Sequence, residues 1–85
     1  MADDDIEIGE SVDIAVVVDE SGEAVGAVVD DVVVASGPEG SIVDETIDVL
    51  DNAGHLLMED ETVSVYDADA KLVAQEETVA IALDE

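Results

Sequence analysis

The phrase "DETIDV" occupies residues 44–49, "DETVSV" occupies 60–65 and "EETVAI" occupies 76–81, so one phrase returns every sixteen residues. Each copy has an acidic residue, a Glu and a Thr, followed by apolar residues at alternate positions. Apolar alternation with many β-branched residues is typical of strands. Near the N-terminus, "ESVDIAVVVDESGEAV" (10–25) gives the same phrase with a longer first arm. The repeat therefore predicts strands joined at a regular interval.

Segments with turn chemistry separate these arms. They are "DESGE" (19–23), "SGPEG" (36–40), "DNAGH" (51–55) and "DADAK" (67–71). Asp can accept hydrogen bonds within its own turn, Gly adopts positive φ, and Pro fixes φ in advance. Consecutive hairpins of this kind predict an all-β fold, either a small antiparallel sandwich or a barrel. A short β-solenoid is the alternative.

The expected strands are short. Asp30 and Asp31 divide the most apolar segment of the chain and predict a tight turn or a bulge there. Residues 1–9 are expected to form a flexible acidic arm and 10–85 a single β domain. The expected strands cover residues 11–18, 24–29, 31–35, 41–43, 46–50, 55–58, 62–66, 71–74 and 78–83.

Charge is the strongest feature of the composition. The formal net charge is −24, and Lys71 is the only basic residue apart from one histidine. A hydrophobic content of 48% together with the alternation argues against disorder. The composition resembles that of haloarchaeal proteins, which implies that high K⁺ or Na⁺ is required for folding, since salt screens the self-repulsion of such a chain. An engineered acidic variant with a reduced amino-acid alphabet would have the same composition.

This charge balance excludes several classes of partner. A basic surface for nucleic acid is absent, and so is affinity for anionic membranes. The segment "MADDDIEIGE" (1–10) has neither the basic nor the apolar region of a signal peptide. We therefore expect a protein that stays in the cytoplasm, or that reaches a virion after assembly.

Candidate sites are few. His55 is the only side chain that ordinarily titrates near neutrality, and an exposed turn histidine is its simplest interpretation. Asp51, Asp67 and Asp69 are weak Ca²⁺ candidates, because "DADAKL" matches the start of an EF-hand loop but lacks its glycine and has Thr78 at the bidentate-Glu position. Turn chemistry explains these aspartates equally. No nucleophile motif or phosphate-binding loop occurs, so we expect neither an enzyme nor a cofactor.

The C-terminal third, "EDETVSVYDADAKLVAQEETVAIALDE" (59–85), resembles small capsid decoration (cement) proteins of tailed viruses. Those chains tend to end in a strand, an Asp-rich hairpin and a final strand. Ala70 and Ala80 stand where that pattern often has glycine. The resemblance implies a β-rich protein on a capsid lattice, often a trimer, with a flexible N-terminal arm.

The sequence thus predicts a non-enzymatic structural or interaction protein, with a decoration or surface protein of a haloarchaeal virus as its most specific form. The alternative is a cytoplasmic acidic binding module, either an Ig-like adaptor or a DNA mimic that inhibits a basic nucleic-acid-binding protein. We expect a homo-oligomer, and edge strands that contact neighbouring subunits. The residues expected at these contacts are Val12, Ile14, Val16, Val79, Ile81 and Leu83.

Overall fold

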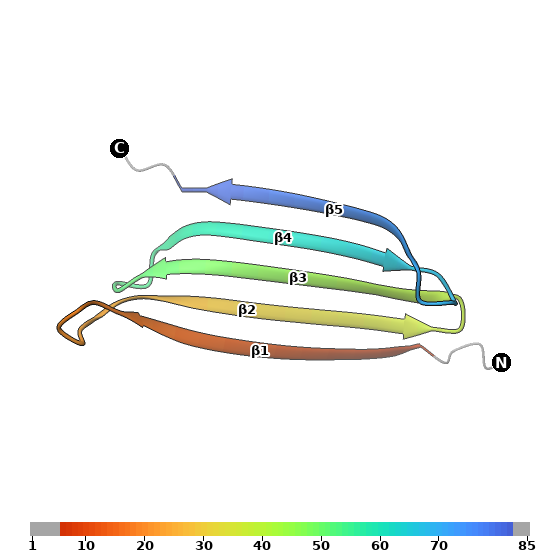
Figure 1. The fold of residues 1–85 in the computed structure, drawn as a ribbon, viewed down its shortest axis with the longest axis horizontal. Coiled ribbons are helices and arrows are strands. Elements are labelled where there is room, and N and C mark those ends of the chain that lie inside the picture. Colours follow the sequence, from red (N-terminus) through yellow and green to blue (C-terminus); the bar gives the residue numbers. More distant parts are fainter. Residues whose placement is uncertain (1–5, 83–85) are drawn as a thin grey trace.

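The computed structural model describes residues 6–82, which form one five-stranded antiparallel sheet in the order β1-β2-β3-β4-β5 (Figure 1). Each strand joins the next through a hairpin, so the predicted all-β fold built of consecutive hairpins is confirmed. The sheet is open, with β1 at one edge and β5 at the other. The strands are β1 (Glu7–Val18), β2 (Ala24–Gly37), β3 (Gly40–Asp51), β4 (Leu56–Tyr66) and β5 (Leu72–Ile81).

The strands are longer than the sequence predicts, because the acidic pairs lie inside them. The predicted turn or bulge at Asp30 and Asp31 is wrong: both residues lie in β2, where they pair with Ile47 and Thr46 of β3. Successive strand residues point to opposite faces. In a sheet without a second layer, both faces have access to water, so neighbouring acids can each lie on a wet face while the backbone ladder continues through them.

The N-terminal end of the sheet lies within the predicted arm. Strand β1 begins at Glu7, so residues 7–9 belong to the sheet and pair with β2. Residues 1–5 of the predicted arm, and Leu83 among the predicted contact residues, lie outside the described residues.

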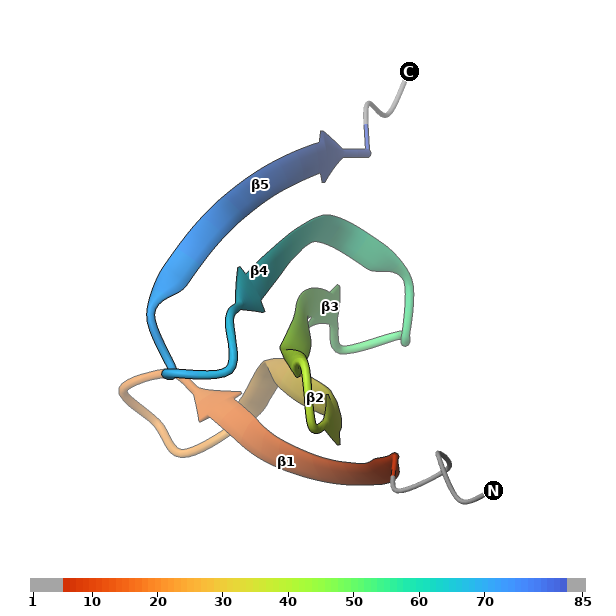
Figure 2. The ribbon, with the colours of Figure 1, turned by 90° about the vertical axis from the view of Figure 1, so that its right-hand side faces the viewer.

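The sheet is a single twisted layer. Figure 2, viewed along the strands, shows them turning progressively from β1 to β5. The radius of gyration is 16.8 Å, whereas a compact domain of this length has about 12 Å. Within residues 6–82 no hydrophobic side chain is fully buried, and the one buried residue is Ser64, which accepts a hydrogen bond from Gln75. Stable domains normally pack at least two layers around a core. The described residues form only one layer.

Three hairpins share one loop structure. In each, the Oδ1 atom of the first loop residue, an aspartate, accepts backbone N–H bonds from the residues two and four positions later. The fourth loop residue has positive φ: 90° at Gly22, 87° at Gly54 and 63° at Ala70. The predicted turn chemistry of Asp19, Asp51 and Asp67 is therefore confirmed.

Ala70 occupies the positive-φ position of its loop, whereas the two equivalent loops have glycine there, Gly22 and Gly54. A left-handed conformation costs an L-residue with a Cβ about 1 kcal/mol relative to glycine. We expect Ala70→Gly to stabilise the protein by about 1 kcal/mol, measured by thermal or denaturant unfolding at high salt. The control is Ala68→Gly in the same loop, where the ordinary entropic cost of glycine lowers stability. Equal effects of the two variants would contradict this explanation.

Candidate interaction surface

An acidic belt crosses the middle of the sheet on both faces. The register places the repeated phrase of β3, β4 and β5 side by side, with Glu45 opposite Thr62 and Glu61 opposite Thr78. The sixteen-residue interval therefore aligns the acids at the strand centres rather than at the strand starts. On one face the belt comprises Asp30, Glu45, Asp60 and Glu77, and on the other it comprises Glu10, Asp31, Asp44, Asp48, Glu59 and Glu61.

The belt consists of Asp–Glu contacts between adjacent strands. The pKa of Glu45 is raised because its protonated form can donate a hydrogen bond to Asp30, while its ionised form is repelled by Asp30 and Asp60. The same two causes raise the pKa of Glu77 beside Asp60.

The opposite face repeats this arrangement. The pKa of Glu10 beside Asp31 and of Glu61 beside Asp44 is raised first by a hydrogen bond that only the protonated glutamate can donate, then by repulsion. Repulsion by Asp48 is the largest cause of the raised pKa of Glu59. Like charges on neighbouring strands destabilise a sheet, so the belt opposes folding at neutral pH.

The belt aspartates each have one oxygen with little access to water. One carboxylate oxygen in each is shielded from solvent and has no hydrogen-bond partner within the protein. A buried polar atom without a partner is costly. Each of these five aspartates contacts one of the five glutamates whose pKa is raised. They are Asp30, Asp31, Asp44, Asp48 and Asp60.

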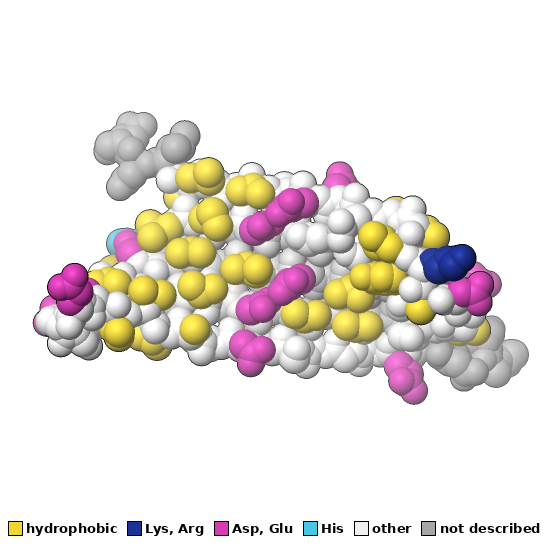
Figure 3. Space-filling view, viewed as in Figure 1, with side chains coloured by type: hydrophobic (Ala, Val, Ile, Leu, Met, Phe, Trp, Pro, Cys, Tyr) yellow, Lys and Arg dark blue, Asp and Glu magenta, His cyan; other side chains and the backbone are white. Residues whose placement is uncertain are grey.

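Aliphatic side chains occupy the sheet on both sides of the belt. Figure 3 shows acidic atoms across the middle of one face, with hydrophobic atoms towards both ends of the strands. Fifteen large hydrophobic side chains of the described residues are exposed, with Ile8 at 72%, Ile14 at 67% and Ile81 at 63%. Contiguous exposed apolar surface on a soluble chain is a mark of an interaction site.

The predicted contact residues within the described range lie on the two edge strands. Val12, Ile14 and Val16 are in β1, with exposures of 51%, 67% and 62%. Val79 and Ile81 are in β5, with 52% and 63%. The register places the two sets on opposite faces and opposite edges. They therefore form two separate surfaces.

The structure separates the candidate Ca²⁺ ligands. Asp51 is the last residue of β3, where the β3–β4 hairpin turn begins, whereas Asp67 and Asp69 lie in the β4–β5 loop at the other end of the sheet (Figure 1). Oδ1 of Asp51 and of Asp67 already accepts two loop N–H bonds. Within residues 6–82, no group of three or more His, Asp or Glu side chains is arranged to hold a metal ion.

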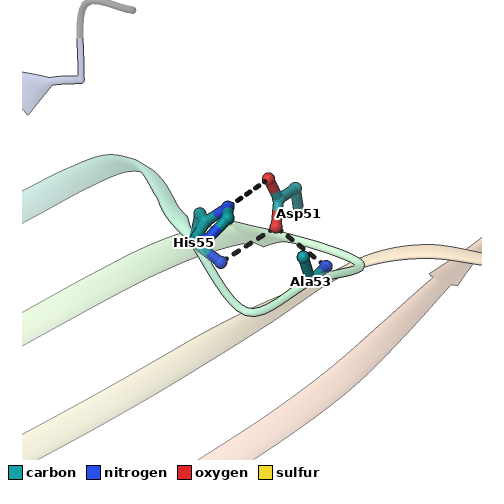
Figure 4. Close-up of polar contacts among 3 residues, drawn as sticks. All are labelled: Asp51, Ala53 and His55. Atoms are coloured by element: carbon teal, nitrogen blue, oxygen red, sulfur yellow. Dashed lines mark hydrogen bonds and ion pairs between the residues drawn. The ribbon is translucent and has the colours of Figure 1, made fainter.

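His55 belongs to the β3–β4 loop. Its Nδ1 lies 3.4 Å from Oδ2 of Asp51, and its side chain is 78% exposed (Figure 4). The backbone N–H of His55 is the first cause of the lowered pKa of Asp51, and the imidazole contributes through its charge and a hydrogen bond. The contact makes His55 part of the turn.

The shared loop structure gives a direct test. Asp67→Ala removes the acceptor of the Asp69 and Lys71 N–H groups, and we expect it to lower the free energy of unfolding by about 1 kcal/mol. The measurement is thermal unfolding at high salt. Asp69→Ala is the matched control, since it removes the same charge from the same loop but leaves both hydrogen bonds. If both variants lost equal stability, the hydrogen bonds would not be the cause.

A hollow of about 520 Å³ lies at the β2–β3 hairpin. Its lining includes Pro38, Ile42, Val65 and Tyr66, with Glu39 as an acidic member. It is mainly apolar and contains none of the candidate site residues.

Sequence reasoning missed the belt as a unit, although the sixteen-residue interval contained the signal. In a meander of hairpins, equal spacing brings the same phrase to the same height on successive strands.

Comparison with family models, with curated proteins and with solved structures gives no match. Residues 6–82 include no helix with the length and hydrophobicity to cross a bilayer.

Proposed function

We propose that this protein is a non-enzymatic structural protein that works by assembling with protein partners, and that its most specific setting is the surface of a haloarchaeal virus capsid. The observation that supports assembly is the absence of any fully buried hydrophobic side chain within residues 6–82. A single-layer sheet with aliphatic side chains on both faces gains most of its hydrophobic stabilisation from contact with another surface.

The charge fits the same proposal. A net charge of −24 keeps an apolar sheet soluble and suits multimolar salt, where the screening length falls to about 3 Å. The resemblance of residues 59–85 to capsid decoration proteins supplies the viral setting.

The test has two stages. Light-scattering mass and circular dichroism across a KCl series from about 0.1 M to about 3 M measure assembly and folding together. We expect a folded oligomer at high salt and loss of structure at low salt. Mass spectrometry of virus particles purified in multimolar salt then measures occupancy, and we expect many copies per particle. A folded monomer at every salt concentration, together with absence from such particles, would overturn the proposal.

A further inference from the structure

We propose that two copies of this chain stack face to face through an aliphatic patch beside the acidic belt, so that the dimer becomes a two-layer β-sandwich. This inference rests on the proposed assembly function and names the partner and the surface. The aliphatic patch consists of Ile14, Val16, Val18, Val29, Leu50 and Leu56.

The register places these side chains on one face. Val16 pairs with Ala27, Ala27 pairs with Leu50, and Leu50 pairs with Leu56, so the row crosses from β1 to β4. Ile14 pairs with Val29 in the adjacent row of the same face. The patch is most open at the β1 side, where Ile14, Val16 and Val18 are 67%, 62% and 55% exposed.

The accessible surface of the chain is larger than that of a compact monomer of the same mass. The accessible surface is 6174 Å², whereas a compact monomer of 8.8 kDa has about 4,800 Å², leaving an excess of about 1,400 Å². A standard interface buries about 800 Å² on each partner. Even half of the excess is close to what one side of a stable dimer requires.

The acidic belt limits which part of the face a partner can cover. A partner covering the whole of this face would bury its belt carboxylates, including the oxygens of Asp31, Asp44 and Asp48 that already lack partners, and burying unpaired carboxylates is costly. The aliphatic patch lies towards one end of the strands and borders the belt, because Val29 pairs with Asp48. Stacking there leaves the belt at the wet rim of an apolar core, which is the usual anatomy of an interface.

A second copy of this chain presents a patch of the same shape and chemistry, so the patch can pack against itself. A two-fold axis through the patch brings it against itself, and sheets stack at about 10 Å with interdigitating side chains. Both copies carry −24, so the dimer requires screening and is strengthened by salt. Binding to a basic protein would instead be weakened by salt.

The test is sedimentation or light-scattering mass in about 3 M KCl over a concentration series, with circular dichroism on the same samples. The patch variant is Ile14→Thr with Val16→Thr. Threonine keeps the β-branched shape and strand propensity but places a hydroxyl in the apolar contact. We therefore expect the dissociation constant of the dimer to rise by about tenfold or more per position. The control is Val17→Thr with Val79→Thr, which makes two similar changes on the opposite face, one in β1 and one in β5.

A wild-type dimer that the patch variant weakens and the control does not would support the inference. A dimer equally strong in both variants, or weakened only by the control, would overturn it and place the contact at an edge or on the other face. A trimer insensitive to the patch variant would also overturn it while leaving the proposed assembly function intact. A wild-type monomer that still occupies virus particles would do the same.

Discussion

Replacing Gly40 with alanine is expected to destabilise the sheet more than any other single change described here. Gly40 begins β3 directly after the β2–β3 turn and has φ of 142°, a conformation that residues with a Cβ rarely adopt. A Cβ there would collide with the carbonyl oxygen of Tyr66 and lie 3.2 Å from two Asp67 backbone atoms. Strain and collision act together, so we expect a loss of about 3 kcal/mol.

The effect extends beyond the turn, because the collision is with β4. Ser41, the next residue, pairs with Tyr66, so relief of the collision must separate the central strands. The measurement is denaturant unfolding in high salt, followed by circular dichroism. Gly9→Ala is the matched control: Gly9 lies in a strand, has ordinary φ, and its Cβ would meet nothing within 4 Å. We expect Gly9→Ala to be neutral or slightly stabilising. A Gly40→Ala variant as stable as Gly9→Ala would contradict the structure of this turn.

The second large effect concerns the acidic belt. We expect Glu45→Gln with Glu61→Gln to fold at markedly lower KCl than the wild type. Each glutamine keeps the shape of the side chain, can donate a hydrogen bond to Asp30 or Asp44, and removes the like charge beside it. The measurement is the KCl midpoint of folding, followed by circular dichroism at about pH 7.

The control for this variant is Glu20→Gln with Glu39→Gln. It makes the same change in net charge at two exposed turn residues outside the belt. If both double variants shifted the KCl midpoint equally, net charge alone would set the salt requirement. A larger shift for the belt variant would locate the requirement in the contacts between strands.

The belt also determines how stability depends on pH. Five glutamates have a pKa raised above the ordinary 4.5, so the folded protein binds their protons more tightly than the unfolded chain does. Lowering the pH from about 7 towards this value therefore adds stability, and raising it removes stability.

Two loop aspartates have the opposite dependence. The pKa of Asp19 is lowered first by a hydrogen bond from the Ser21 hydroxyl, and that of Asp51 by the backbone N–H of His55. Their stabilisation is present above the ordinary 3.8 and is lost as the pH falls through the lowered values. At the lowest KCl concentration at which the protein is folded at about pH 7, we expect the melting temperature to rise from about pH 7 to about pH 5 and to fall again in stronger acid. A melting temperature highest at neutral pH would contradict the belt's role.

Local structure followed from the sequence alone. Alternation of β-branched residues predicted strands, and the aspartate and glycine positions predicted the hairpin loops, because both signals depend on neighbouring residues only. The same local reasoning split four strands at their acidic pairs. It interpreted Asp30 and Asp31 as a tight turn or a bulge, since consecutive charges in a conventional half-buried strand would place one in a core.

The number of layers depended on the three-dimensional fold: the described residues form one layer and therefore have no core. That arrangement gives both faces access to water and lets acids continue through the strand centres. Pairing across strands is a non-local property, so the register alone revealed that the sixteen-residue phrase forms a belt and that the aliphatic residues divide into patches on either side of it. The contact residues predicted in β1 and β5 are exposed for the same reason: no second layer within the described residues covers them.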